Sequence, residues 1–249
     1  IEIRGAELVT SPGTKFFLPN HVALVDPQIL YSYLLSRRPV APVMTQGYYE
    51  MPVLHRLFRC IGTIPVADLE AGGNIEDLQN LADTVSAALA AGRSTLIYPS
   101  GRLARAGHEV IYGKQATARI IATAPDDLQL IGVRIRGLWG SMWSFGYDGH
   151  SPQFVPLYLK GLVLLLANAI AFVPRRRVTI EFCDLSAELR AAPDVRACNT
   201  ALERFYNAPG EEPGLLEQRQ TDLAIAEAAQ HVADGALDPL PARTVAGQH

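Results

Sequence analysis

Short runs of β-prone residues alternate along this chain with longer runs of helical character. Such an alternation, with connections long enough to hold a helix, is typical of a sheet whose two faces are covered by helices. The predicted strands are KFFL (15–18), VAPVM (40–44), CIGTIPV (60–66), STLIYP (94–99), LQLIGVRI (128–135) and RVTIEF (177–182). We therefore expect an α/β fold with a mixed, mostly parallel sheet flanked by helices.

Two of the intervening segments carry clear helix signals. Asp26 and Pro27 suit an N-cap followed by proline at the first helical position, ahead of the helical run 28–38. The segment 74–92 spaces its leucines and valine three and four residues apart and stops at Gly92. This second segment predicts an amphipathic helix on the surface of the sheet.

Length and composition bound the domain organisation. The chain has 249 residues, of which 49% are hydrophobic, so it can bury a substantial core. We expect one domain over residues 1–185, a C-terminal helical extension over 186–234 and a loose tail over 235–249. Because the chain begins without Met and without a signal-peptide pattern, we expect it to be excised from a longer protein.

Charge and cysteine usage exclude several classes of protein. The net charge is −3 and the basic residues form no concentrated stripe, which argues against nucleic-acid binding. The three cysteines have no C-x-x-C spacing, so the sequence predicts neither a disulfide framework nor a metal site.

The stretch LPNHVALVDP (18–27) contains a histidine and an aspartate five residues apart, His21 and Asp26. On one continuous helix they would point about 140° apart, so they can meet only across a turn. A carboxylate beside a histidine fixes its tautomer and increases its basicity, as proton abstraction from a hydroxyl requires. On its own, the pair favours a simpler interpretation, in which His21 hydrogen-bonds a loop and Asp26 caps a helix.

Two later stretches also offer polar or flexible residues beside predicted strands. In YPSGR (98–102), Gly101 allows close backbone approach and Arg102 can grip a phosphate. GTIPV (62–66) ends another predicted strand. Strand ends of this kind converge on one crevice of an open α/β sheet, so three loops can line one pocket. Taken singly, each is also compatible with an ordinary strand-to-helix turn.

The order N-H-x-x-x-x-D, G-x-I-P-V and Y-P-x-G-R resembles the glycerolipid acyltransferase superfamily, which includes the bacterial 1-acyl-glycerol-3-phosphate acyltransferases. The resemblance extends from about Phe17 to Phe182. The stretches 134–137, 167–182 and 204–207 resemble the acyltransferase part of bifunctional proteins. In those proteins a 2-acylglycerophosphoethanolamine acyltransferase is fused to an acyl-ACP synthetase.

The resemblance implies a role for each motif residue. His21 would be the general base and Asp26 its orienting partner. The substrate-binding residues would be Asn20, Gly62, Thr63, Ile64, Pro65, Ser100, Gly101 and Arg102.

The implied reaction moves a fatty acyl chain from acyl-ACP or acyl-CoA to a lysophospholipid hydroxyl, with no cofactor, metal or acyl-enzyme. His21 would take the hydroxyl proton, and the alkoxide would attack the thioester and expel a thiolate. The implied partners are the acyl donor, the lysophospholipid acceptor, the membrane surface and a fused or associated acyl-ACP synthetase domain.

Three positions depart from the family pattern. Ser100 stands where the family has Glu, Ala67-Asp68 where it often has a basic residue, and Arg134 where it has Pro. These departures imply an altered acceptor or a weakened enzyme. Two alternatives therefore stay open: a catalytically quiet lipid-binding or docking module, which Ser100 favours, and a thioesterase in which His21 activates water.

The run GLVLLLANAIAFV (161–173) is uncharged and 13 residues long, too short to cross a bilayer core of about 30 Å. Lys160 and Arg175–Arg177 flank it, as in a helix that lies in one leaflet with cations at the headgroups. A core helix over the sheet fits equally well. From the resemblance we expect a peripheral protein on the cytoplasmic face of the inner membrane.

Overall fold

The computed structural model describes residues 1–52, 54–67, 74–150, 152, 157, 159, 161–163, 166 and 176–212. The strands are β1 Glu2–Arg4, β2 Lys15–Pro19, β3 Ala41–Thr45, β4 Ile64–Val66, β5 Thr95–Leu96, β6 Gln129–Arg136 and β7 Thr179–Asp184. The helices are α1 Glu7–Thr10, α2 Asp26–Leu35, α3 Gln46–Tyr49, α4 His55–Cys60, α5 Ile75–Ala90, α6 Ala116–Ala122, the 3₁₀ turn η1 Phe145–Tyr147, α8 Ser186–Arg190 and α9 Val195–Asn207.

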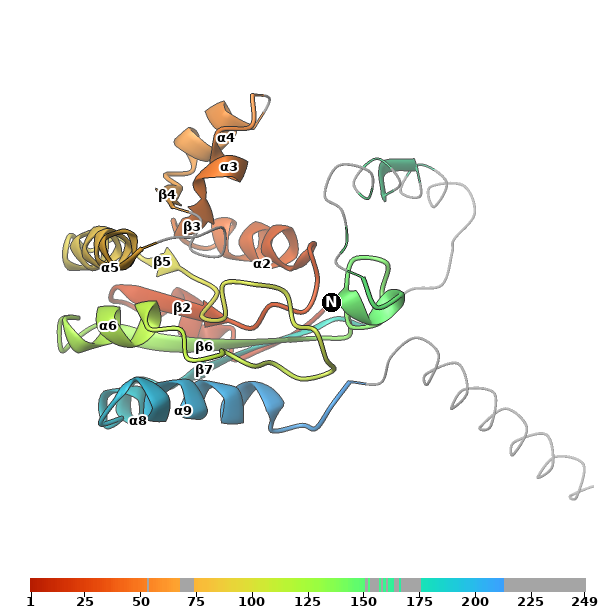
Figure 1. Ribbon diagram of the computed structural model, residues 1–249. Helices are drawn as coiled ribbons and strands as arrows, with labels where there is room; N and C mark the ends of the chain where they lie inside the picture. Colours follow the sequence, from red (N-terminus) through yellow and green to blue (C-terminus); the bar gives the residue numbers. More distant parts are fainter. Residues whose placement is uncertain are drawn as a thin grey trace, which may run out of the picture.

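Within these residues the strands form one sheet in the order β1-β7-β6-β2-β5-β3-β4 (Figure 1). Each pair of neighbouring strands is parallel except β6 and β7, which run antiparallel. The predicted fold class, an α/β fold with a mixed, mostly parallel sheet flanked by helices, is confirmed.

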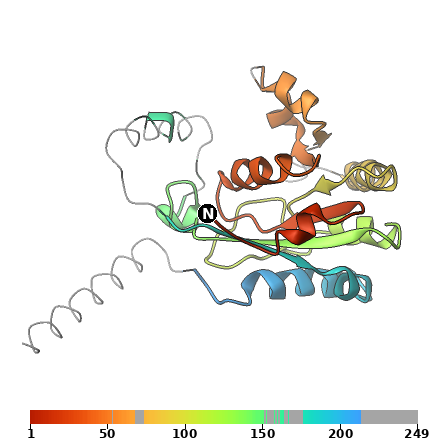
Figure 2. The same cartoon turned by 180° about the vertical axis from the view of Figure 1, so that it is seen from behind.

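The alternation of side chains along β2 divides the core between the two faces of the sheet. Phe16 and Leu18 pack into a cluster that includes residues of α5, α6, α8 and α9, whereas Phe17 packs into a cluster with α1 and α2. Figures 1 and 2 both show α9 on one side of β2 and β6 and α2 on the other. The central strands are thus covered on both faces, as their apolar composition requires.

The strands at the β4 edge are shorter than predicted. β4 begins at Ile64, and the preceding residues from His55 to Cys60 form α4. Cys60, which the sequence predicts as the first residue of a strand, is instead the last residue of α4 and is exposed. β5 has only two residues, and β1 was not predicted because three residues are too few to show an alternating pattern.

α2 begins where the sequence indicates, but its cap differs from the prediction. The N-cap position is Val25, and Asp26 lies inside the helix at its first position. The carboxylate of Asp26 turns back to the N–H groups of Val22 and Ala23. The predicted capping role of Asp26 is wrong, because the preceding turn brings those two donors closer to its carboxylate.

α5 has the ends that the sequence predicts. Asn74 accepts a hydrogen bond from the N–H of Asp77, and the Asp77 side chain accepts one from the N–H of Asn74. This reciprocal pair satisfies two donors that a helix start leaves open. Beyond the helix, Gly92 adopts a positive φ of 78°, which a glycine reaches without strain.

The helices α8 and α9 follow β7 and share the core of the sheet through Leu189, Leu202 and Tyr206. The predicted boundary at residue 185 falls between β7 and α8. The predicted end of the extension at 234 and the tail 235–249 lie outside the described residues, as does most of 161–173. No helix in the described part of the chain is both long and apolar enough to cross a membrane.

Candidate active site

His21 lies two residues beyond the end of β2, at the carboxyl edge of the parallel strands. β2 lies between β5 and β6 and is parallel to both, so the segments that follow these two strands emerge at the same edge. This edge is where open α/β sheets bind their ligands. The His21 side chain is 15% exposed, so its ring can be reached from solvent.

The carboxylate of Asp26 is the centre of the turn that carries His21. Its Oδ2 accepts hydrogen bonds from the N–H of Val22 at 2.6 Å and of Ala23 at 2.8 Å. The same oxygen lies 3.4 Å from Nδ1 of His21, at the long end of hydrogen bonding. Asp26 therefore holds the turn firmly and contacts the ring more loosely.

Burial and hydrogen bonding oppose each other at Asp26. Its side chain is fully buried, and this desolvation raises its pKa above the ordinary value. The hydrogen bonds from His21 and from the two backbone N–H groups lower the pKa again. A carboxylate at Nδ1 selects the tautomer that carries its proton there, which leaves Nε2 of His21 as the basic nitrogen.

The ring of Tyr98 packs against the imidazole from the segment that follows β5. The two ring centroids are 4.3 Å apart with an interplanar angle of 34°. Tyr98 is partly buried, with its hydroxyl oxygen enclosed, and both this desolvation and the charges of Asp26 and Glu109 raise its pKa well above the ordinary value. Its hydroxyl therefore stays neutral, and its ring forms one wall beside His21.

The backbone of His21 is fixed from both sides by residues of the loop after β5. The carboxylate oxygen Oε2 of Glu109 accepts the His21 N–H at 3.0 Å. The carbonyl oxygen of His21 accepts the N–H of Ala104 at 2.7 Å. The two motif loops, around His21 and after Tyr98, are thus joined into one unit.

The YPSGR stretch places Arg102 on an aromatic platform. The guanidinium carbon of Arg102 lies 3.6 Å from the centroid of the Tyr112 ring, a cation–π contact. Tyr112 has a positive φ of 54°, which is unusual for a bulky residue and marks a constrained position. Gly101 has a φ of 67°, and Ser100 is buried and donates to the Arg102 carbonyl oxygen at 2.9 Å.

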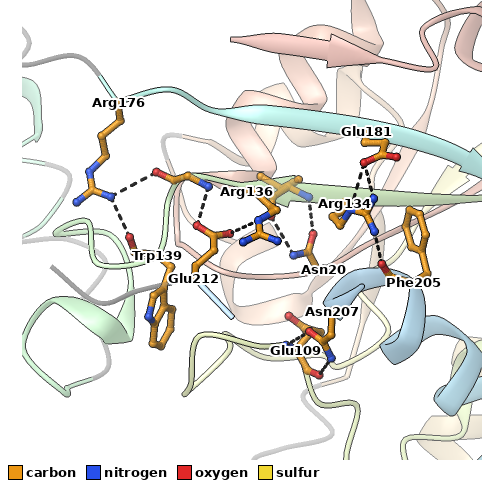
Figure 3. Close-up of polar contacts among 12 residues, drawn as sticks. Asn20, Glu109, Arg134, Arg136, Trp139, Arg176, Glu181, Phe205, Asn207 and Glu212 are labelled. Atoms are coloured by element: carbon orange, nitrogen blue, oxygen red, sulfur yellow. Dashed lines mark hydrogen bonds and ion pairs between the residues drawn. The ribbon is translucent and has the colours of Figure 1, made fainter. Parts of the chain in front are cut away.

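Asn20, which precedes the histidine, braces the sheet (Figure 3). Its side-chain amide donates to the carbonyl oxygen of Ile135 at 3.0 Å, and its carbonyl oxygen accepts the Ile135 N–H at 2.7 Å. Asn20 is almost fully buried. These contacts make Asn20 a holder of the loop after β2, while its predicted contact with substrate stays a prediction.

The GTIPV stretch lies farther from His21 than the other two motifs. β4 pairs with β3, β3 pairs with β5, and β5 pairs with β2. Together these registers set Ile64 level with Leu18, so Pro65 and Val66 lie nearer the carboxyl edge of the sheet, where His21 lies. Three strand spacings of about 4.8 Å separate β4 from β2. Gly62 and Thr63 precede β4, so the expectation that they lie at its carboxyl end is wrong.

The contacts of Gly62 and Thr63 agree with this position. The carbonyl oxygen of Gly62 accepts a hydrogen bond from Arg93, which lies just before β5. Thr63 and Ile64 are buried, while Pro65 is exposed. The structure therefore brings His21, Asp26, Ser100, Gly101 and Arg102 to one edge and leaves Gly62 and Thr63 below it. Their predicted part in substrate binding stays a prediction.

Two residues at the site were not predicted from the sequence. Tyr98 belongs to the YPSGR motif at the end of a predicted strand, and that position is a signal that could have identified it. Glu109 carried no such signal, because it lies in a loop with no periodicity. In the described part of the chain, no group of His, Cys, Asp and Glu side chains could hold a metal ion. The assembled site offers an oriented base beside an arginine that can bind an anion.

Comparisons with known proteins agree with this fold. A crystal structure of the 1-acyl-sn-glycerophosphate (LPA) acyltransferase PlsC from Thermotoga maritima is similar, with a TM-score of 0.52 and 13% sequence identity. The match covers 84% of this chain and 69% of that one. Comparison with curated proteins gives no significant match. The family model for acyltransferases matches residues 1–136, more than half of the chain and every residue of the site described above. The chain therefore belongs to the acyltransferase family.

Proposed function

We propose that this protein transfers a fatty acyl chain from an acyl thioester to the hydroxyl of a lysophospholipid, with His21 as the general base. The observation that carries the proposal is the turn that seats His21 over the buried carboxylate of Asp26, with the ring accessible from solvent. Membership of the acyltransferase family and the likeness to a lysophosphatidic acid acyltransferase support the reaction class.

The proton of the acceptor hydroxyl passes to Nε2 of His21 as the oxygen attacks the thioester carbonyl. The resulting tetrahedral oxyanion collapses, the carbon–sulfur bond breaks, and the thiolate leaves as the new ester forms. The imidazolium then returns its proton to the thiolate or to water. Because a thiolate leaves readily, one base and the correct placement of both substrates supply much of the acceleration. No acyl-enzyme is needed.

Arg102 is the residue best placed to bind the acceptor's phosphate. It follows β5 at the same edge as His21, and the Tyr112 ring packs against its guanidinium and fixes its orientation. A planar guanidinium offers two parallel donors that match a phosphate. Ser100 and Gly101 lie beside Arg102, and in this proposal they shape the floor of the acceptor site.

The acceptor of such an enzyme resides in a bilayer, so the protein needs a surface that meets lipid. Among the described residues of the segment 157–166, four apolar side chains are exposed: Leu159, Leu162, Val163 and Leu166. Their exposure supports contact with a lipid surface, and we propose that the protein is peripheral on the cytoplasmic face of the inner membrane. We propose acyl-ACP or acyl-CoA as the donor and a fused or associated acyl-ACP synthetase as a partner that supplies it.

Product analysis tests the proposal. The protein is incubated with labelled acyl-ACP or acyl-CoA, with and without a panel of lysophospholipids, and the lipids are separated. Diacyl phospholipid that forms only with an acceptor supports the proposal. Free fatty acid released at the same rate without an acceptor makes the protein a thioesterase. Donor binding without any turnover makes it a quiet lipid-binding module.

A further inference from the structure

A buried glutamate occupies the space beside Ser100, the position at which the family pattern has a Glu. Glu109 lies nine residues farther along the chain, and only 3% of it is exposed. Its carboxylate accepts the His21 N–H at 3.0 Å; burial raises the pKa of this carboxyl group, and the nearby Ser100 hydroxyl lowers it. A carboxylate is thus present near position 100, supplied from another part of the same loop.

The backbone of Glu109 is hydrogen-bonded to the last residue of α9 (Figure 3). Asn207, the last residue of α9, accepts the Glu109 N–H at 2.8 Å and donates to the Glu109 carbonyl oxygen at 2.9 Å. One turn earlier, Glu203 accepts the N–H of Ile111 at 2.6 Å. These three bonds join α9 to the backbone of Glu109 and to that of Ile111, two residues later.

The C-terminal end of α9 is also hydrogen-bonded to β2, the strand that precedes His21. The hydroxyl of Tyr206 donates to the carbonyl oxygen of Leu18 at 2.8 Å, and both groups are buried. α9 therefore contacts both β2, which precedes His21 in the sequence, and the loop that carries Glu109. α9 lies outside residues 1–136, the part of the chain that the family model matches.

We propose that Glu109 is a positioning residue for His21: Asn207 of α9 holds the Glu109 backbone, and the Glu109 carboxylate in turn fixes the backbone of the catalytic loop. A hydrogen bond from a backbone N–H to a carboxylate is stronger than one between neutral groups, so this one limits where the imidazole can lie. Glu109 does not itself touch the reacting atoms in this proposal. The inference rests on the proposed function, because it assigns the residue to the same reaction.

The test compares Glu109→Ala with Glu109→Gln, which keeps an acceptor oxygen. The matched control is Glu212→Ala, because Glu212 is also a largely buried carboxylate that accepts a backbone N–H, that of Gly137 at 2.7 Å. Two readouts are taken from each protein: the kinetic constants of acyl transfer, and the amide resonance and hydrogen exchange of His21, assigned with a His21→Ala sample.

The proposal predicts that Glu109→Ala lowers kcat at least about tenfold with KM within about twofold, moves the His21 amide resonance upfield and speeds its exchange. Glu109→Gln keeps kcat within about threefold of wild type, and Glu212→Ala leaves the His21 amide unchanged. If Glu109→Ala does not fold, Glu109→Asp carries the same test, because it withdraws the carboxylate by one methylene group.

A fall in kcat without a change at the His21 amide overturns the proposal, and so does a changed amide with an unchanged kcat. If the wild-type protein shows no acyl transfer to any acceptor, the proposed function fails. The amide measurement alone then decides whether Glu109 holds the His21 backbone, so the two failures are distinguishable.

Discussion

At the scale of single residues, the site depends on how one carboxylate distributes its hydrogen bonds. Asp26 accepts two short bonds from the backbone and one long contact from the His21 ring. An asparagine at this position can still accept the backbone bonds through its oxygen. Its NH₂ group then takes the place of Oδ1, and the neutral amide oxygen beside Nδ1 no longer stabilises the imidazolium, so His21 becomes a much weaker base.

We therefore predict that Asp26→Asn lowers the rate of acyl transfer by about 100-fold or more, as expected for loss of a general base. The same substitution should raise, rather than lower, the free energy of unfolding. Burial raises the pKa of Asp26 in the folded state, so the folded protein binds a proton more readily than the unfolded chain. Wild-type stability then falls as the pH rises from about 3.9 through the raised pKa.

Urea unfolding at about pH 4, near the unfolded-state pKa, and at pH 8 measures this difference. The stability of Asp26→Asn relative to wild type should increase between the two pH values, because only the wild type must bury a charge at the higher pH. A relative stability that decreases over this range would contradict a raised pKa at Asp26.

A second residue-scale prediction concerns the platform under Arg102. Tyr112→Ala removes the cation–π contact, which contributes about 0.5–1 kcal/mol at an exposed site. We expect KM for a phosphate-bearing acceptor to rise about two- to fivefold with kcat almost unchanged. Tyr112→Phe keeps the ring and serves as the control, so an equal effect of both variants would argue against ring stacking as the cause. Steady-state kinetics with a varied acceptor measures both.

At the scale of elements, α2 carries Asp26 itself, and α9 acts on the site from outside the part of the chain that the family model matches. It packs against β6 and reaches the Glu109 loop through its last residue, Asn207. Replacing Asn207 by Ala leaves two backbone groups of Glu109 without their partners, and each such buried group costs about 1–3 kcal/mol. The helix thus links the stability of the fold to the position of the catalytic loop.

We predict that Asn207→Ala lowers the free energy of unfolding by about 2 kcal/mol and reduces kcat. The control is Arg204→Ala on the same helix, which removes only an exposed ion pair with Glu188 and should change both quantities little. Urea unfolding and steady-state kinetics give the two measurements. Asn207→Ala with wild-type activity would separate α9 from the catalytic loop.

The elements also show where prediction from sequence ends. The pairing of His21 with Asp26 is predictable because two residues five positions apart can meet only across a turn, and a turn is a local structure. The contact between Glu109 and Asn207 joins residues 98 positions apart. No local periodicity signals it, since it depends on how α9 packs against the sheet. The sequence predicts the start of β4 at Cys60 rather than Ile64, because Cys60 and Ile61 at the end of α4 are as apolar as the strand that follows.

At the scale of the whole molecule, the fold class follows from the sequence because strand-like and helical segments alternate over most of its length. The order of the strands does not, since it depends on which crossovers the helices make. This order decides that β2 lies between β5 and β6, with the loop after β5 beside His21, whereas β4 lies at the far edge. It therefore explains why the three motifs contribute unequally to the site.

The exposed apolar residues at 159–166 lead to a prediction for the whole molecule. Leu162→Asp combined with Leu166→Asp should weaken binding to anionic vesicles, because charged side chains oppose burial among acyl chains. Turnover of a bilayer-resident acceptor should fall, whereas turnover of a dispersed short-chain acceptor should not. Leu35→Asp, an exposed leucine of α2, is the control. Vesicle co-sedimentation measures binding, and equal binding by all three proteins would remove this segment from the membrane contact.

The central claim is that His21 is the base of an acyl transfer, and the acceptor-dependent transfer rate of His21→Ala tests it most directly. The matched control is His55→Ala, because the His55 ring is also partly buried and contacts a backbone carbonyl oxygen, that of Tyr49 at 3.1 Å. We predict that His21→Ala reduces the rate by about 10²- to 10⁴-fold while His55→Ala stays within about threefold of wild type. A folded His21→Ala protein that transfers acyl chains at the wild-type rate would contradict the account.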